Sequence, residues 1–133
     1  MELCEGTLTD LITTHKKRNS YFKVEEIKQF LKSLIPLMAK MQKLGYLHRD
    51  IKPDNVLIAK GKKQEFKMSD FGFALKINPY SDRNIAGTKE YVSPKLLVKF
   101  KNHRISVEGH NIKDDVYSFG KTLYEMMTLE MGQ

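Results

Sequence analysis

The sequence predicts a mainly helical α+β fold, carried by a single unit of 133 residues. Residues 24–44 have the apolar spacing of a long amphipathic helix, and the residues from 114 onward repeat that spacing. Two short runs between these segments have the composition of β-strands. A chain of this length fits one domain, or one lobe of a larger domain, and it can bury roughly two-thirds of its unfolded surface. The sequence is therefore long enough to form a hydrophobic core.

In the segment 24–44, apolar residues recur three and four positions apart, so they lie on one face of a helix. They are Ile27, Phe30, Leu31, Leu34, Ile35, Met38, Met41 and Leu44. Gly45 follows directly, in the position just beyond a helix end where glycine is common. Pro36 lies inside the pattern, and because proline has no backbone N–H we expect a kink there.

A shorter helix is predicted near the N-terminus. Thr9 has the side chain of an N-terminal cap, and Leu11 and Ile12 supply apolar groups after it. Residues 15–20 are polar and predict a break before the long helix.

Two more helices are predicted in the C-terminal half. Leu96 and Leu97 begin a short one, and the polar, basic residues 99–113 are expected to form a loop. The last helix begins at Asp114 and has an apolar face formed by Val116, Phe119, Leu123, Met126 and Met127. We expect its methionines and Met131 to be core residues rather than a binding surface.

The predicted strands lie between the two long helices. Residues 55–58 and 65–69 form β-type runs, and Gly61 with its lysine neighbours fits a hairpin turn between them. Residues 73–91 follow no period and are long for a plain connection. Such segments in compact domains are usually functional or disordered.

Composition excludes several classes of protein. No run of about 18 apolar residues exists, which argues against a transmembrane helix, and the N-terminus does not read as a signal peptide. The single cysteine, Cys4, rules out an internal disulfide and a multi-cysteine zinc site, so we expect a reducing compartment, cytoplasmic or nuclear.

The net charge of +7 comes from separate clusters at 15–18, 60–63 and 95–104. Aromatic residues are not interleaved with them, so a nucleic-acid-binding domain is only a third hypothesis.

The strongest chemical signal is the run HRDIKPDN at residues 48–55, which lies between a predicted helix end and a predicted strand. Fifteen residues after Asn55 comes Asp70-Phe71-Gly72, at the end of the next strand. The fixed positions of the first run occur by chance in about one chain in a million of this length. Both runs match motifs of the eukaryotic protein kinases, and the chain resembles that family from Met1 to about Met127.

This resemblance implies the C-terminal lobe of a protein kinase, mostly helical, with short β-hairpins at the catalytic loop and the N-terminal lobe missing. Residues 1–133 would comprise a hinge, the catalytic loop, the metal loop, the activation segment and the start of the anchoring helix. The implied activity is transfer of a phosphoryl group from ATP, with Mg²⁺, to serine or threonine of a protein substrate.

The resemblance also assigns roles to four residues. Asp50 would accept the proton of the substrate hydroxyl and orient its oxygen, and Lys52 would neutralise charge on the γ-phosphate. Asn55 and Asp70 would supply the oxygen ligands that Mg²⁺ prefers.

Two features resemble the serine/threonine-specific branch of the family. One is Lys52, and the other is the run GTKEYVSP at residues 87–94, which resembles the substrate-facing loop of that branch. By this resemblance Thr88 would form hydrogen bonds with Asp50 and Lys52. The alternative is that Thr88 is an ordinary turn residue.

Supporting residues are implied in the same way. His48 would be a packing residue near Phe71 rather than a catalytic group, and Asp115, in the run DVYSFG, would accept backbone N–H groups from the turn at His48 and Arg49. The alternative for Asp115 is helix capping alone.

Arg49 would bind a phosphate on the activation segment. The position that usually carries this phosphate is Asn84 here. Ser81 is the best alternative, although its spacing differs.

The first residues look like the hinge between two kinase lobes. The backbones of Glu2 and Cys4 would form hydrogen bonds with adenine, and Leu57 would pack beneath the ring. The alternative for Leu57 is packing in the core.

The sequence also departs from the family pattern. It contains no glycine-rich phosphate loop, no β-strand lysine for the α- and β-phosphates, and no glutamate partner of that lysine. Lys95 stands where the family has a glutamate. We therefore expect the 133-residue chain to be marginally stable and weakly active or inactive alone. The second hypothesis is a non-catalytic, kinase-like interaction module.

Overall fold

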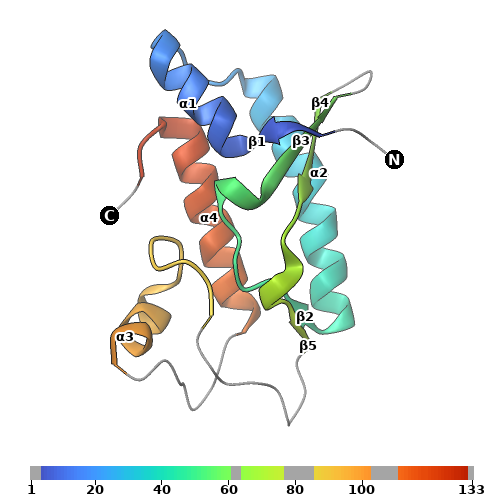
Figure 1. The fold of residues 1–133 in the computed structure, drawn as a ribbon. Helices are drawn as coiled ribbons and strands as arrows, with labels where there is room; N and C mark the ends of the chain where they lie inside the picture. The colour runs from blue at the N-terminus through green and yellow to red at the C-terminus, as the bar shows by residue number, and fades with distance from the viewer. Residues whose placement is uncertain (1–3, 61–63, 77–85, 103–110, 132–133) are drawn as a thin grey trace.

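The computed structural model describes residues 4–60, 64–76, 86–102 and 111–131. Figure 1 shows two long helices, α2 and α4, along the length of the molecule, with α1 across one end and α3 at the other. The elements in chain order are β1 (Cys4–Thr7), α1 (Leu8–Arg18), α2 (Val24–Leu44), β2 (Tyr46–Leu47), the 3-10 turn η1 (Pro53–Asn55), β3 (Val56–Lys60), β4 (Gln64–Met68), the 3-10 turn η2 (Phe71–Phe73), β5 (Leu75–Lys76), α3 (Pro94–Asn102) and α4 (Ile112–Thr128).

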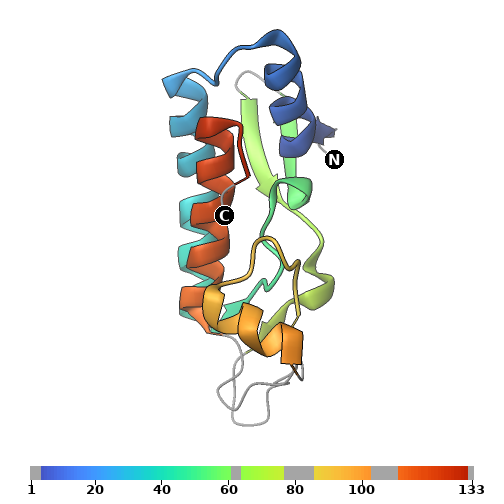
Figure 2. The same ribbon diagram turned by 90° about the vertical axis from the view of Figure 1, so that its left-hand side faces the viewer.

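The strands form two small antiparallel sheets. The larger has the order β1-β3-β4, and the smaller pairs β2 with β5. Thr7 lies opposite Leu57, and Val56 lies opposite Met68. Figure 2 shows α2 and α4 side by side, with the strands along one side of the pair. The segment that carries the HRDIKPDN run therefore lies between the strands and α4.

Three phenylalanines join the elements at the centre. Phe30 of α2 is fully buried and stacks on Phe119 of α4, with ring centroids 5.3 Å apart and planes 6° apart. Phe30 also meets Phe66 of β4 edge-on, at a centroid distance of 5.5 Å. Burial of each ring contributes about 1.5–3 kcal/mol, so this cluster holds the helices and the sheet in register.

The long helix is confirmed over its full predicted range. α2 spans Val24–Leu44, and Gly45 follows it in the left-handed conformation with φ of 80°. The helix continues through Pro36, whose side chain is exposed. The hairpin is confirmed as β3 and β4, while Gly61 lies outside the described residues.

The predicted cap at Thr9 is wrong. Thr7 caps α1 instead: its Oγ1 accepts the N–H of Asp10, and the Asp10 carboxylate accepts the N–H of Thr7. The helix also continues through the polar residues predicted to break it, up to Arg18. Lysine and arginine are good helix formers, and their charges suit the negative end of the helix dipole.

The predicted loop at 99–113 is too long. α3 runs to Asn102, and α4 begins at Ile112, where Asn111 and Asp114 form a capping box. Residues 103–110 lie outside the described residues. Within the described part of the chain, no helix has the length and hydropathy needed to cross a bilayer.

Candidate functional site

The turn at His48 and Arg49 is held by one carboxylate of α4. Asp115 accepts the backbone N–H of His48 at 2.8 Å and that of Arg49 at 3.0 Å, across more than sixty positions of sequence. Arg49 has a positive φ of 71°, which is unfavourable for a residue with a Cβ. Burial raises the pKa of Asp115, and the two N–H groups oppose this shift. The predicted role of Asp115 as an acceptor is confirmed.

His48 packs in the interior near Phe71, as predicted. Its side chain is fully buried, its Nδ1 accepts the backbone N–H of Asp50 at 3.1 Å, and its Nε2 lies 2.8 Å from the carbonyl oxygen of Ser69. A neutral imidazole with the proton on Nε2 satisfies both contacts. The ring also lies 5.0 Å from that of Phe71. His48 thereby ties the Asp50 backbone to the segment that carries Asp70.

The carboxylate of Asp50 is buried among polar groups from two parts of the chain, the 48–55 run and the segment that carries Thr88. Its Oδ1 accepts the Thr88 hydroxyl at 2.7 Å, and its Oδ2 accepts Nδ2 of Asn55 at 3.2 Å. The Lys52 ammonium lies 3.9 Å from Oδ2. Thr88 therefore contacts Asp50 as predicted. A hydrogen bond between Thr88 and Lys52 is not found among the described residues.

Thr88 reaches Asp50 because the preceding residue has no side chain. Gly87 has φ of +112°, and a Cβ there would lie 2.5 Å from the carbonyl oxygen of Arg49. The carbonyl oxygen of Thr88 accepts the N–H groups of Tyr91 and Val92, which closes a turn directly after it. The segment is thus fixed on both sides of the Thr88 hydroxyl.

Ser118 and Glu125 of α4 also hold this segment in place, and neither was identified from the sequence as a functional residue. The hydroxyl of Ser118 donates to the carbonyl oxygen of Tyr91 at 2.7 Å, and the phenol of Tyr91 donates to Oε1 of Glu125. Burial raises the pKa of Tyr91, and the hydrogen bond with Glu125 raises it further. Polar residues at the helical spacing of Ser118, Thr122 and Glu125, on the face that packs inward, are the sequence signal for this contact.

Ser69, the residue directly before Asp70, links Asp70 to Asn55. The carbonyl oxygen of Asn55 accepts both the backbone N–H of Ser69 at 2.8 Å and its hydroxyl at 3.1 Å. The Asn55 side chain donates through Nδ2 to the backbone oxygen of Asp50 at 2.7 Å and to its Oδ2 at 3.2 Å, and neither bond uses Oδ1 of Asn55. Asp70 has φ of 54° and an exposed side chain whose Oδ1 accepts the N–H of Gly72.

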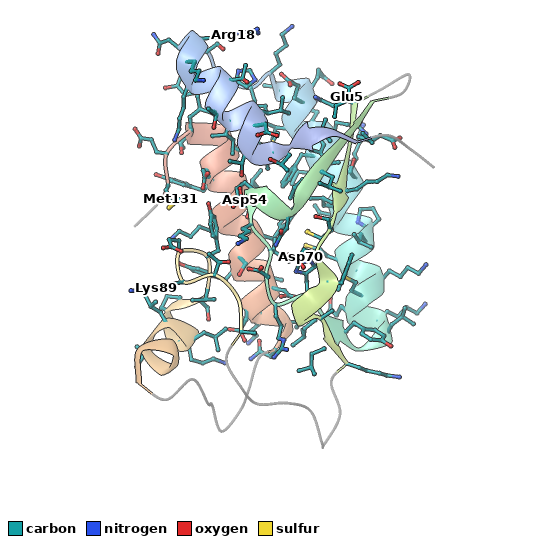
Figure 3. All side chains as sticks on the ribbon, in the orientation of Figure 1. Glu5, Arg18, Asp54, Asp70, Lys89 and Met131 are labelled. Atoms are coloured by element: carbon teal, nitrogen blue, oxygen red, sulfur yellow. The ribbon has the colours of Figure 1, made fainter. Side chains whose placement is uncertain are left out.

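This donor set fits Mg²⁺. Amide and carboxylate oxygens are the ligands that this cation prefers, and in nucleotide sites it is usually held by one or two carboxylates together with phosphates and water. The described residues contain no group of three or more His, Cys, Asp or Glu side chains that could hold an ion by themselves. In Figure 3, Asp70 lies near the centre of the molecule.

Leu57 lies on the open face of the larger sheet. Its neighbours Val56 and Ile58 are buried in the core, whereas Leu57 is only half-buried and lies outside the buried cluster. Side chains alternate between the faces of a strand, so Leu57 lies on the face opposite to Val56 and Ile58, and its contact with adenine stays a prediction. Cys4 begins the neighbouring strand β1, opposite Ala59. Glu2 lies outside the described residues.

Lys95 contacts a carboxylate of α4. Its ammonium lies 3.9 Å from Oδ2 of Asp114, and Oδ1 of Asp114 accepts the hydroxyl of Ser93 at 2.8 Å. The start of α3 is therefore anchored to the first turn of α4. Ser81, the candidate for phosphorylation, and Asn84, at the position that usually carries the phosphate, lie outside the described residues.

Comparisons with known proteins agree with this geometry. The family model described as "Protein kinase domain" matches residues 1–131. The chain is 34% identical to serine/threonine-protein kinase atg1 of Dictyostelium discoideum, over 98% of this chain and 18% of that protein. It is 35% identical to the probable serine/threonine-protein kinase WNK6 of Oryza sativa subsp. japonica, over 94% of this chain and 26% of that protein. It is 32% identical to sperm motility kinase 3A of Mus musculus, over 96% and 23%. The chain thus spans about a fifth to a quarter of the length of these relatives.

Proposed function

The chain belongs to the protein kinase domain family, and from this premise we propose that it provides the catalytic and metal-binding groups for phosphoryl transfer from ATP to a serine or threonine hydroxyl of a protein substrate. The observation that carries this proposal is the Asp50 carboxylate, buried and held by Thr88, Asn55 and Lys52. Phosphoryl transfer depends on positioning and on neutralisation of charge, and this arrangement supplies both.

Asp50 would act on the substrate hydroxyl. The hydroxyl oxygen attacks the γ-phosphorus, the bond from that phosphorus to the β,γ-bridging oxygen breaks, and the proton passes toward Asp50. Thr88 and Asn55 hold the two oxygens of this carboxylate in place, so little reorganisation is needed when the proton moves. Phosphoryl transfer to serine or threonine, rather than to tyrosine, is supported by the names of the relatives, which include serine/threonine-protein kinases.

Lys52 and the oxygen pair of Asn55 and Asp70 would hold the nucleotide phosphates. The side chain of Lys52 is about four-fifths buried, so its charge is less screened by water than that of a surface lysine. Asn55 and Asp70 would hold Mg²⁺, and the ion would neutralise charge on the phosphates. Leu57 and the backbone of Cys4 would contribute the adenine side of the site.

The 133 residues contain no glycine-rich phosphate loop and no second phosphate-binding lysine of the family pattern. We therefore expect the chain by itself to bind ATP weakly and to transfer phosphate slowly. A non-catalytic, kinase-like interaction module is the second candidate.

The test is radiometric transfer from γ-labelled ATP to a mixed serine and threonine peptide, under single-turnover conditions with excess chain. We expect slow, Mg²⁺-dependent transfer that is lost in Asp50→Asn. Thr14→Ala serves as a matched control, because the hydroxyl of Thr14 bonds only within the exposed face of α1. Transfer that is equal in the wild type and in Asp50→Asn would contradict the catalytic role and favour the interaction module.

A further inference from the structure

The end of α1 and its connection to α2 carry four cations and no carboxylate between residues 16 and 23. All four side chains are exposed, and they belong to Lys16, Lys17, Arg18 and Lys23. Within the described part of the chain, none of the four forms an ion pair. Figure 3 shows Arg18 at one end of the molecule, away from Asp54 and Asp70 near the centre. The positive charge is therefore concentrated at this end and is open to solvent.

Two carboxylates follow in the first turn of α2, and both have partners within that turn. Glu25 lies 3.8 Å from the ammonium of Lys28, and Glu26 accepts the backbone N–H of Lys23 at 3.1 Å. Negative side chains are also favourable at the N-terminus of a helix. Residues 16–28 together hold five cationic and two acidic side chains, a net charge of +3. The two carboxylates therefore reduce the positive charge of this end without cancelling it.

The connection between the two helices has a defined fold. The carbonyl oxygen of His15 accepts the N–H of Ser20 at 3.0 Å, and its Nδ1 lies 3.1 Å from the hydroxyl of Ser20. The His15 ring also lies 4.2 Å from that of Phe22, which is buried in the core. Because Phe22 points inward, its neighbour Tyr21 is held in solvent.

Tyr21 and Val24 place apolar surface beside the cations. They are the two most exposed large apolar side chains of the described residues, at 68% and 65%, and Lys23 lies between them in the sequence. Lysine and arginine are attracted to anionic lipid headgroups, and the tyrosine ring favours the boundary between headgroups and acyl chains. A nucleic acid fits less well, because the aliphatic Val24 offers a base neither stacking nor a hydrogen bond. The end of α1 and the start of α2 also lie along one edge of the molecule (Figure 1), where a broad surface can meet both.

We propose that the 16–24 segment binds the surface of a membrane that contains anionic lipids. The four cations contact the headgroups, while Tyr21 and Val24 enter the boundary between headgroups and acyl chains. This is attachment to a surface, and no helix crosses the bilayer. The membrane contact goes beyond phosphoryl transfer and does not depend on it.

The first test is co-sedimentation of the full 133-residue chain with vesicles of phosphatidylcholine, alone or with about 30 mol% phosphatidylserine. We expect binding to the phosphatidylserine vesicles only, and weaker binding as the salt concentration rises. Each cation near an anionic surface contributes about fivefold. The double variant Lys16→Glu with Lys17→Glu should therefore bind at least tenfold more weakly.

The matched control is the double variant Lys40→Glu with Lys43→Glu. It changes the net charge equally, at two exposed positions toward the other end of the 21-residue helix α2, which is about 30 Å long. This variant should bind the vesicles as the wild type does.

The second test follows the apolar part of the contact. The sequence contains no tryptophan, so Tyr21→Trp introduces a single fluorescent reporter. Its emission should shift to shorter wavelength when phosphatidylserine vesicles are added, because the ring leaves water. Tyr46→Trp, directly after the far end of α2, should show no shift.

Circular dichroism checks the fold of each variant, and Lys16→Gln with Lys17→Gln replaces the glutamate pair if that pair unfolds the chain. Equal loss of binding in the two charge-reversed variants overturns the membrane contact, as does equal binding to both kinds of vesicle or to neither. An emission of Tyr21→Trp that does not shift overturns it too. So does a chain that binds a single-stranded RNA oligonucleotide through Lys16 and Lys17 but binds no vesicle, which would assign the segment to nucleic acid. Neither assay contains ATP, so a failure of phosphoryl transfer leaves these results intact.

Discussion

The carbonyl oxygen of Arg49 lies 2.5 Å from the place where a Cβ on Gly87 would be. Both residues have positive φ, +71° for Arg49 and +112° for Gly87. The two backbones therefore lie close together where the 86–93 segment passes the 48–55 run. This contact sets how closely the next residue, Thr88, approaches Asp50, which lies directly after Arg49.

Gly87→Ala should destabilise the chain and misplace Thr88. The new Cβ meets backbone rather than a flexible side chain, and φ of +112° is strained for alanine, so we expect a cost of about 1–3 kcal/mol. Urea unfolding measures this cost. The matched control is Gly120→Ala in α4, where nothing lies within 4 Å of the added Cβ. Since alanine is favoured over glycine in a helix, this control should gain about 0.5–1 kcal/mol. Equal stability of the two variants would show that the backbone contact is not tight.

Thr88→Ala should reduce phosphoryl transfer, while Thr88→Ser should retain most of it. Alanine removes the hydroxyl that donates to Asp50, whereas serine keeps it. Hydrogen bonds to charged groups contribute about 1.5–3 kcal/mol, so we expect the single-turnover rate of the alanine variant to fall roughly tenfold to a hundredfold. The peptide concentration for half-maximal rate should change little, because the bond orients Asp50 rather than the peptide. A serine variant as slow as alanine would contradict this role of the hydroxyl.

The parts of the fold in which apolar residues recur regularly could be predicted from the sequence. The apolar spacing and Gly45 define α2 at both ends, because both depend on local physics. The start of α1 was misplaced, because Thr7 and Thr9 both have side chains suited to a cap. Only the reciprocal bond with Asp10 distinguishes them.

In the candidate site, too, some residues can be found from a local motif, whereas others depend on contacts between distant segments. Asp50, Asn55 and Asp70 lie in dense local motifs, and the sequence therefore points to them as candidates. The contact of Tyr91 with Glu125 joins positions 34 apart, and it depends on how α4 packs against the 86–93 segment. No local pattern encodes such a contact, although the polar residues on the inner face of α4 indicate that one exists.

Asp115→Ala should be among the most destabilising substitutions of α4. It leaves the N–H groups of His48 and Arg49 without their acceptor, and each lost partner in a buried site costs about 1–3 kcal/mol. The stability of Asp115→Asn should lie between that of Asp115→Ala and that of the wild type, because the single carbonyl oxygen of asparagine can accept one of the two N–H groups. Thermal and urea unfolding give this order. Lys113→Ala, an exposed position in the same turn of α4, should be close to neutral. An asparagine variant as unstable as alanine would show that both bonds act only as a pair.

Tyr91 should make the chain sensitive to alkaline pH. Its pKa is raised above the ordinary value of 10.0, first by burial and then by Glu125. Above pH 10 the unfolded chain loses the phenol proton while the folded chain keeps it. The unfolded state then binds fewer protons, and the free energy of unfolding falls as pH rises, by up to about 1.4 kcal/mol per pH unit. The contribution of this group is fully present below pH 10 and is lost progressively above it.

Urea unfolding of the wild type and Tyr91→Phe between pH 8 and 11 tests this. Phenylalanine removes the titration, so its free energy of unfolding should fall less steeply above pH 10. At pH 8 the variant should be less stable by about 1–3 kcal/mol, because the carboxylate of Glu125 loses its donor. Tyr21→Phe is the control, since the side chain of Tyr21 is 68% exposed, and its slope should match the wild type. If Tyr91→Phe and the wild type lose stability in parallel above pH 10, the phenol does not remain protonated in the fold, and the bond between Tyr91 and Glu125 is weaker than its geometry indicates.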